Sequence, residues 1–259
     1  IMIEKVRSWQ PDREISLIGD GGYAAVRLIQ HCQQLLRPAK LISRLRLDAC
    51  LHDFPGPQPK GKRGPKPKKG ARLPSLAVHL TDPKTQWKKL KVVWYGGKER
   101  EVEIVTGVCL WYRRGLAPVP IRWLLLRCPE GSFKPQALFC SDPQVPAAQM
   151  IAWFIARWNI EVTFEELRAH LGFETQRQWS DKAIERTAPC LFGLFSLVVL
   201  MAKVLHPETL PIRKASWYRK KEATFIDALA AVRSDLWRSV NYSTSAQEAD
   251  MFLIPQAAL

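Results

Sequence analysis

The chain has 259 residues, including 39 Lys or Arg and 24 Asp or Glu, so its formal net charge is +15. Apolar residues make up 47% of the chain, which excludes wholesale disorder because a sizeable core can be buried. The surplus of cations is typical of nucleic-acid binding, since each neutralised phosphate releases counterions, although ribosomal and membrane-surface proteins carry a similar surplus.

The start of the chain predicts a strand, a helix and a second strand. Residues 15–19 form a short apolar strand, residues 24–36 have apolar positions at helical spacing, and residues 40–47 alternate. Such a unit is typical of parallel strand pairing. Asp20 follows the first strand, at the edge where side chains project beyond the hydrogen-bonded ladder, so it is a candidate functional acid. A cap of the following helix is the alternative role.

Residues 55–74 form a basic segment rich in Pro and Gly, with no large apolar residue before Leu73. This composition predicts a flexible loop and not a core. Its cations indicate DNA contact, either by insertion into the minor groove around Arg63 or through nonspecific phosphate contacts; a solvated linker is the third alternative. The candidate DNA-binding residues of this loop are Lys60, Lys62, Arg63, Lys66, Lys68 and Lys69.

The middle of the chain predicts strands instead of helices. They are expected at residues 88–95, 99–111, 119–128 and 136–140. Gly96 and Gly97 indicate a hairpin turn after the first of them. Asp142 follows the last strand, where we interpret it as a cap or turn residue, with assistance at a metal site as the alternative.

One long helix is predicted from Ala147 to Phe173, because Gly and Pro are absent until its end. At about 100° per residue, a single stripe of this helix carries an aromatic ring, two cations and a carboxylate. These residues are Phe154, Arg157, Glu161 and Arg168. Apolar side chains flank the stripe on both sides, whereas surface helices usually place charge opposite their apolar face. The stripe therefore indicates a functional site.

Two other interpretations of this stripe stay open. Glu161 has the helical spacing of a stabilising ion pair with Arg157 or Arg168, which would make it a structural residue. Glu165 lies on nearly the same side of the helix, so it is an alternative metal ligand.

Two further helices are expected at residues 183–205 and 224–240. The longest uncharged run, residues 187–202, is interrupted by Pro189 and is shorter than the roughly 20 residues that span a bilayer. We therefore expect a buried helix and no membrane partner. The six cysteines contain no Cys-x2-Cys pair, so we interpret them as reduced thiols of a cytoplasmic protein.

Two sequence motifs together carry a family resemblance. Asp20, in LIGDGGY, and the segment FIARWNIEVTFEELR resemble the DDE transposases of bacterial insertion sequences. In the relevant branch, the last catalytic acid lies in a Tyr-x2-Arg-x3-Glu-x6-Lys signature. Phe154 stands at the Tyr position, Arg157 at the Arg, Glu161 at the acid and Arg168 at the Lys.

The resemblance extends from about residue 15 to 205 and implies an α/β fold. The expected fold is an RNase H-like core with a β-rich insertion between the second and third acids and a helical C-terminus. The core then consists of residues 1–50 and 131–206. Residues 51–130 hold the basic loop and the insertion, and residues 207–259 form a helical tail.

The resemblance also implies metal-dependent cleavage and strand transfer of DNA. Asp20 and Glu161 would be the catalytic acids and the ligands of two Mg²⁺ ions, with Mn²⁺ as an alternative metal. Arg157, Arg168 and Tyr23 would contact DNA. The implied partners are the double-stranded ends of an insertion sequence and its target DNA. The full-length protein would be a homo-oligomer in the bacterial cytoplasm, associated with the nucleoid.

The chain departs from the family pattern in three respects. Phe154 lacks the hydroxyl of Tyr, and Arg168 keeps the charge of Lys but changes its geometry. The only Asp before Asp20 is Asp12, in a turn-like segment with no strand to carry a first catalytic acid. We therefore expect a fragment or decayed copy that begins after the first acid and is inactive by itself. A noncatalytic DNA-binding protein derived from the same fold is the alternative.

Overall fold

The structure is a computed structural model, and it describes residues 2–57, 65–175, 177, 179–213 and 220–239. It divides into two compact units, Ile1–Trp158 and Asn159–Leu259, which we call the N-terminal and C-terminal units. Each unit is described by itself.

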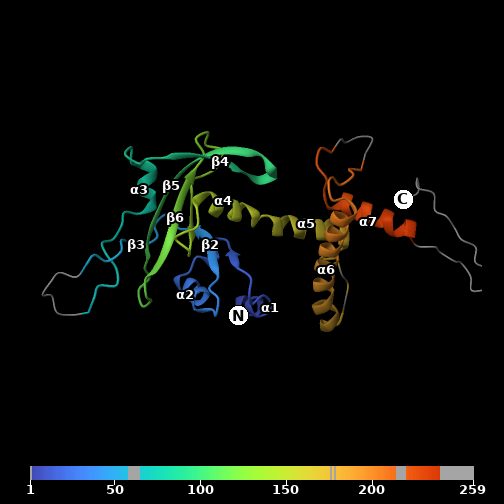
Figure 1. The fold of residues 1–259 in the computed structure, drawn as a ribbon, viewed down its shortest axis with the longest axis horizontal. Helices are drawn as coiled ribbons and strands as arrows, with labels where there is room; N and C mark the ends of the chain where they lie inside the picture. Colours follow the sequence, from blue (N-terminus) through green and yellow to red (C-terminus); the bar gives the residue numbers. More distant parts are fainter. Residues whose placement is uncertain (1, 58–64, 176, 178, 214–219, 240–259) are drawn as a thin grey trace, which may run out of the picture. The chain divides into compact units, whose positions relative to one another are not determined.

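The N-terminal unit is built on a mixed sheet of seven strands (Figure 1). The strands are β1 (Ser16–Ile18), β2 (Lys40–Leu45), β3 (Leu51–His52), β4 (Lys88–Val93), β5 (Glu99–Trp111), β6 (Val119–Arg127) and β7 (Gln136–Cys140). Their order is β1-β2-β7-β6-β5-β3, and β4 also pairs with β5. Only β1 and β2 are parallel; the other pairs of named strands are antiparallel. The unit is therefore α/β, and the predicted strand–helix–strand unit is confirmed.

Helices cover both faces of this sheet. The helices of the unit are α1 (Met2–Trp9), α2 (Val26–Gln34), α3 (Leu76–Thr81) and α4 (Ala147–Ala156), with short 3₁₀ turns η1 (Gly21–Tyr23) and η2 (Tyr95–Gly97). Residues of α2 and α3 pack into one buried cluster and residues of α4 into another. The central strands lie between the two clusters, so both faces of these strands are buried.

The run Leu124-Leu125-Leu126 of β6 shows how the sequence produces this arrangement. Successive side chains of a strand point to opposite faces. Leu125 accordingly belongs to the cluster of α2 and α3, whereas Leu124 and Leu126 belong to the cluster of α4. A continuous apolar run is therefore required where both faces of a strand are buried.

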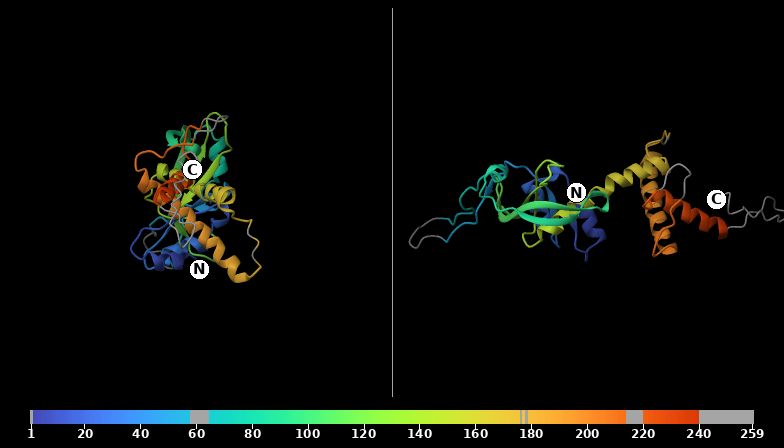
Figure 2. Two further views of the ribbon diagram at one scale, coloured as in Figure 1. Left: turned by 90° about the vertical axis from the view of Figure 1, so that its right-hand side faces the viewer. Right: turned by 90° about the horizontal axis from the view of Figure 1, so that it is seen from above.

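The predicted strands are present, with ends that differ by a few residues from the expected ones. Strand β5 is long because residues 99–104 pair with β4 and residues 103–111 pair with β6. Figure 2 shows the same sheet from two further directions. Three short elements, α1, α3 and β3, were not predicted. Strand β3 contains only two residues, and too short a run carries no periodic signal.

The C-terminal unit consists of α5 (Asn159–Leu171), α6 (Asp181–Leu205) and α7 (Phe225–Ser239). Its core forms between α6 and α7, where Val198 and Ala202 pack against Phe225, Ala228 and Val232. The six cysteines of the chain are free thiols, as expected.

The prediction of one continuous helix from Ala147 to Phe173 is wrong. Helix α4 ends at Ala156 and α5 begins at Asn159. At the interruption, the Trp158 N–H donates to the carbonyl of Ile155 at 3.0 Å, which is a 3₁₀-type bond. The turn carries neither Gly nor Pro, so no helix-breaking residue marks it in the sequence.

The expectation that residues 187–202 form a buried helix is also wrong. Of the residues of α6, only Val198 and Ala202 are buried. The helix continues through Pro189 and starts earlier than expected, at Asp181. By length and composition alone, α6 is sufficiently long and apolar to cross a membrane.

A buried carboxylate organises the start of α7. Asp227 is 1% exposed and accepts hydrogen bonds from the backbone N–H of Arg213 at 3.0 Å and of Thr224 at 2.8 Å. The ammonium of Lys220 donates to the same carboxylate. Burial raises the pKa of Asp227, but the bonds from Lys220, Thr224 and Arg213 outweigh it, so its pKa is lowered overall.

Because its folded-state pKa is lowered, ionised Asp227 stabilises the folded state above the pKa of an unfolded Asp, about 3.9. This contribution is lost as pH falls through the folded-state pKa. Replacing Asp227 by Asn is expected to lower the free energy of unfolding at neutral pH by about 1–3 kcal/mol. The difference from wild type should shrink towards about pH 3, measured by urea unfolding with circular dichroism. Asp235→Asn, at an exposed position of α7, is the control; equal effects of both changes would contradict the prediction.

Candidate functional site

Asp20 lies at the carboxyl end of β1 and is exposed to solvent. The Gly19 N–H still donates to the carbonyl of Ile42 at 2.9 Å, so the parallel ladder ends immediately before Asp20. One carboxylate oxygen, Oδ1, accepts the Gly22 N–H at 2.9 Å and caps the 3₁₀ turn η1. It does not cap the following helix α2, whose N-cap is Ala25. Within the described residues no hydrogen bond engages Oδ2, which leaves that oxygen to a solvent molecule or a cation.

The backbone of Asp20 is held from the neighbouring strand. The hydroxyl of Ser43, a fully buried residue of β2, donates to the carbonyl of Asp20. This bond fixes the peptide from which the carboxylate extends. A rigid peptide is what a site of defined geometry requires.

Tyr23 lies against the backbone just before Asp20. A Cβ atom at Gly19 would lie 2.8 Å from three carbon atoms of the Tyr23 side chain, so only Gly permits this contact. Tyr23 is 54% exposed, which leaves part of its ring in solvent beside Asp20. Tyr23, predicted as a DNA contact, thus has part of its side chain available to a ligand close to Asp20.

Two guanidinium groups and an aromatic ring meet at the same edge of the sheet. Ile18 pairs with Ile42, so Asp20 and Arg44, two residues further along, lie level on neighbouring strands. The guanidinium carbon of Arg44 is 5.5 Å from the centre of the Phe154 ring, and that of Arg157 is 5.9 Å from it. Both distances are within cation–π range.

Phe154 thus serves the core and the site together. It is 5% exposed and belongs to the cluster of α4, while its ring contacts both cations. Sequence reasoning identified Phe154 and Arg157 but missed Arg44. The available signal was a lone Arg between the buried residues Ser43 and Leu45 of β2, on the same face as Ile42.

Glu161 and Arg168 belong to the C-terminal unit. They are seven residues apart in α5, about two turns, and therefore share one face of that helix. Glu161 is half-buried in the first turn, where the helix dipole favours a carboxylate. Arg168 forms an ion pair with Glu174 at 3.2 Å, and Glu165 is exposed. The predicted stripe is divided between the two units because the helix is interrupted.

The basic loop is partly ordered by strand-like pairing. The Asp53 N–H donates to the carbonyl of Ala71 and the Leu73 N–H to that of Leu51, each at 2.9 Å. The ammonium of Lys69 lies 3.6 Å from the centre of the Tyr112 ring. Lys66 and Lys68 are exposed. Three predicted DNA-binding residues, Lys60, Lys62 and Arg63, lie outside the described residues.

The structure contradicts a role for Asp142 beside Asp20. Cys140 pairs with Ile42, and β7 is antiparallel to β2, so Asp142 lies level with Lys40. Its carboxylate forms an ion pair with Lys40 at 3.6 Å and accepts the Gln144 N–H at 2.9 Å. Lys40 and Arg44 are separated by about 13 Å at the usual rise of a strand. Asp142 is therefore a turn residue beside the start of β2, at the opposite end of that strand from Arg44.

The sequence matches no known protein-family model, and no curated protein is significantly similar to it. What the chain does is therefore inferred from the carboxylate, the cations and the strand order described above.

The contact between Gly19 and Tyr23 generates a prediction. Gly19→Ala is expected to lower the free energy of unfolding by about 1–3 kcal/mol, because the added methyl collides with the Tyr23 ring. In a Tyr23→Gly background, which also removes the Cβ atom of residue 23, the same change should be nearly neutral. A double-mutant cycle by urea unfolding measures the coupling. Strictly additive effects of the two changes would show that the methyl group added at position 19 does not contact the Tyr23 side chain.

Proposed function

We propose that this chain is part of a DDE transposase with an RNase H-like core, which cleaves and transfers DNA strands in a metal-dependent reaction. The observation that supports this most directly is the position of Asp20. An exposed carboxylate lies at the carboxyl end of a parallel strand, level with Arg44 and near the Phe154–Arg157 part of the signature. Acid, cations and aromatic ring come from three separate segments of the chain.

The strand arrangement is compatible with this proposal. Among the described residues, β1 pairs with β2 on one side and with no strand on the other. In the proposed enzyme, a further strand carrying the first catalytic acid pairs with this free side of β1. Asp12 does not fill that role, because it lies in a bend between α1 and β1. The strands β3 to β6 fall within residues 51–130, which form the β-rich insertion of the proposed enzyme, and β7 belongs to its core.

Each site residue then has a chemical role. Two Mg²⁺ ions, or Mn²⁺, when bound supply an activated nucleophile and stabilise the leaving oxygen. Magnesium prefers carboxylate oxygens and keeps several waters, which suits Asp20 with its Oδ2 atom available. Glu161 supplies the other acid. Arg157, joined by Arg44, holds a DNA phosphate, and Arg168 and Tyr23 make further DNA contacts.

The substrate and its setting follow from charge. A net charge of +15 favours double-stranded DNA as the partner, both the transposon ends and the target. The cations of the basic loop contribute to DNA binding, including Lys66, Lys68 and Lys69. The full-length protein acts as a homo-oligomer at the bacterial nucleoid in the cytoplasm.

A noncatalytic DNA-binding protein built on the same fold is the second candidate. Three observations favour it: Oδ1 of Asp20 is used as a cap, Phe154 has no hydroxyl, and Arg168 is paired with Glu174. In this alternative the cations grip phosphate and Asp20 is purely structural. Metal binding at Asp20 distinguishes the two functions.

The test replaces Asp20 by Asn, because Asn caps a helix as well as Asp but is a poor ligand for a hard cation. Mn²⁺ binding to the chain, measured by electron paramagnetic resonance, is expected to weaken at least tenfold while stability is unchanged. Asp12→Asn, which removes an equal charge before the amino end of β1, should bind Mn²⁺ like the wild type. Equal binding by Asp20→Asn and wild type would leave the noncatalytic alternative.

A second prediction concerns activity. The chain alone is expected to show negligible nicking of supercoiled DNA in Mg²⁺, because a two-metal site that lacks its first acid loses a ligand. Agarose-gel assays of wild type and Glu161→Gln should be indistinguishable. Nicking by the wild-type chain would contradict the predicted inactivity. Loss of that nicking in Glu161→Gln would then support the catalytic role of Glu161.

A further inference from the structure

The loop between β5 and β6, residues 112–118, is surrounded by three pockets. They measure about 430, 480 and 440 Å³, and all three are lined by Gly115 and Leu116. The loop turns at Gly115, whose φ of 83° favours glycine. We call this loop with its pockets the hairpin-tip surface.

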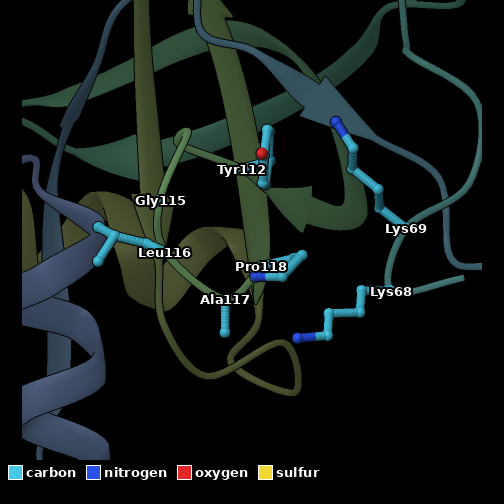
Figure 3. A pocket seen from close by; sticks show the side chains of 7 residues that line it. All are labelled: Lys68, Lys69, Tyr112, Gly115, Leu116, Ala117 and Pro118. Carbon is cyan, nitrogen blue, oxygen red and sulfur yellow. The ribbon is translucent and has the colours of Figure 1, made fainter. Parts of the chain in front are cut away.

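The first pocket is formed with the end of the basic loop (Figure 3). Lys68 and Lys69 face Tyr112, Ala117 and Pro118 across it. Lys69 is positioned by two contacts, with its ammonium 3.6 Å from the centre of the Tyr112 ring and 3.1 Å from Nε2 of His52. The basic loop is therefore attached to the hairpin tip by one of its own cations.

The other two pockets lie between the hairpin tip and α2. One is lined by Arg27, Arg113 and Arg114. The other is lined by amide side chains of α2, including Gln30, whose Nε2 donates to the carbonyl of Ala117 at 2.8 Å. This bond anchors the tip on α2, and the remaining amides present further donors.

The charged side chains that line these pockets are all cationic. In the part of the chain that the structure describes, no carboxylate forms an ion pair with Arg27, Arg113, Arg114 or Lys68. Arg113 and Arg114 are exposed. Cations brought together from three segments without neutralising acids create a positive potential that attracts a polyanion.

Strand register places this surface away from Asp20. Arg122 of β6 pairs with Cys140, which pairs with Ile42 of β2, so β6 runs parallel to β2. The hairpin tip precedes Val119 and lies at the edge of the sheet where β2 begins, whereas Asp20 follows the carboxyl end of β1. The loop and Asp20 therefore lie at opposite ends of the strands, and α2 connects the two, because Ala25 and Arg27 at its start line one of the pockets.

We propose that the hairpin-tip surface binds the phosphate backbone of duplex DNA, as a second contact distinct from the edge that carries Asp20. The inference rests on the proposed function for its choice of polyanion. Cations flank the tip on two sides, from the basic loop and from α2, and a duplex presents a row of phosphates on either side of each groove. Side-chain amides and backbone N–H groups add neutral donors, as at many DNA backbone contacts.

The experiment removes two charges from the tip with Arg113→Gln/Arg114→Gln in the full chain. Affinity for a fluorescent duplex of random sequence is measured by anisotropy at several salt concentrations. Loss of two phosphate contacts should reduce the slope of log affinity against log salt by about 1.8. The dissociation constant at about 0.1 M salt should rise roughly tenfold.

The matched control is Lys88→Gln/Lys91→Gln, which removes two charges from exposed positions of β4. A slope change in the control as large as in the tip variant would overturn the proposal, because net charge alone would then explain it. Stronger competition by single-stranded RNA or polyglutamate than by unlabelled duplex would overturn duplex DNA as the occupant.

Measuring Mn²⁺ binding in the same variants separates this inference from the proposed function. The tip variant should bind Mn²⁺ like the wild type, because Arg113 and Arg114 belong to the loop at the other end of the strands from Asp20. A reduced salt slope in the tip variant, with no Asp20-dependent Mn²⁺ binding in any variant, would uphold the DNA contact and reject the catalytic proposal. An unchanged salt slope in the tip variant, together with Mn²⁺ binding that depends on Asp20, would reject the DNA contact at the hairpin-tip surface and uphold the catalytic proposal.

Discussion

The N-terminal unit depends on one constraint, which is that its central strands are buried on both faces. Strands β2, β7 and β6 lie between the cluster of α2 and α3 and the cluster of α4. A slip of one residue in any of these strands would exchange its two faces, and both would be mismatched. The register is therefore fixed, and with it the level at which each strand ends.

The candidate site is a consequence of that register. Asp20 is exposed because β1 ends where the ladder to Ile42 ends, and Arg44 lies beside it because β2 continues two residues beyond that point. Helix α4 must bury Phe154 on the same face of the sheet that carries Arg44. Arg157, the residue that follows α4, contacts the Phe154 ring and therefore lies near Arg44 as well. Packing thus positions these cations at the end of the strands that carries Asp20.

The positive charge of the chain is concentrated in a similar way. The sequence shows an excess of cations spread over its length, but the fold collects part of it at the hairpin tip and part at the edge of Asp20. A protein that handles a long polyanion benefits from several such surfaces, because each neutralised phosphate adds to affinity. Two surfaces at opposite ends of the strands suit a ligand that extends across the unit.

The sequence by itself determined the α/β class, the parallel pair β1–β2, the strands β4 to β7 and the helices after them, because each has a clear apolar period or turn signal. It also identified Asp20, Phe154 and Arg157. Only the tertiary structure decided that the helix predicted from Ala147 to Phe173 is interrupted after Ala156, since no Gly or Pro marks the turn. It likewise revealed Arg44 beside Phe154 and the cations around Gly115. Such contacts join segments far apart in the chain, and local periodicity carries no information about which strands will be neighbours.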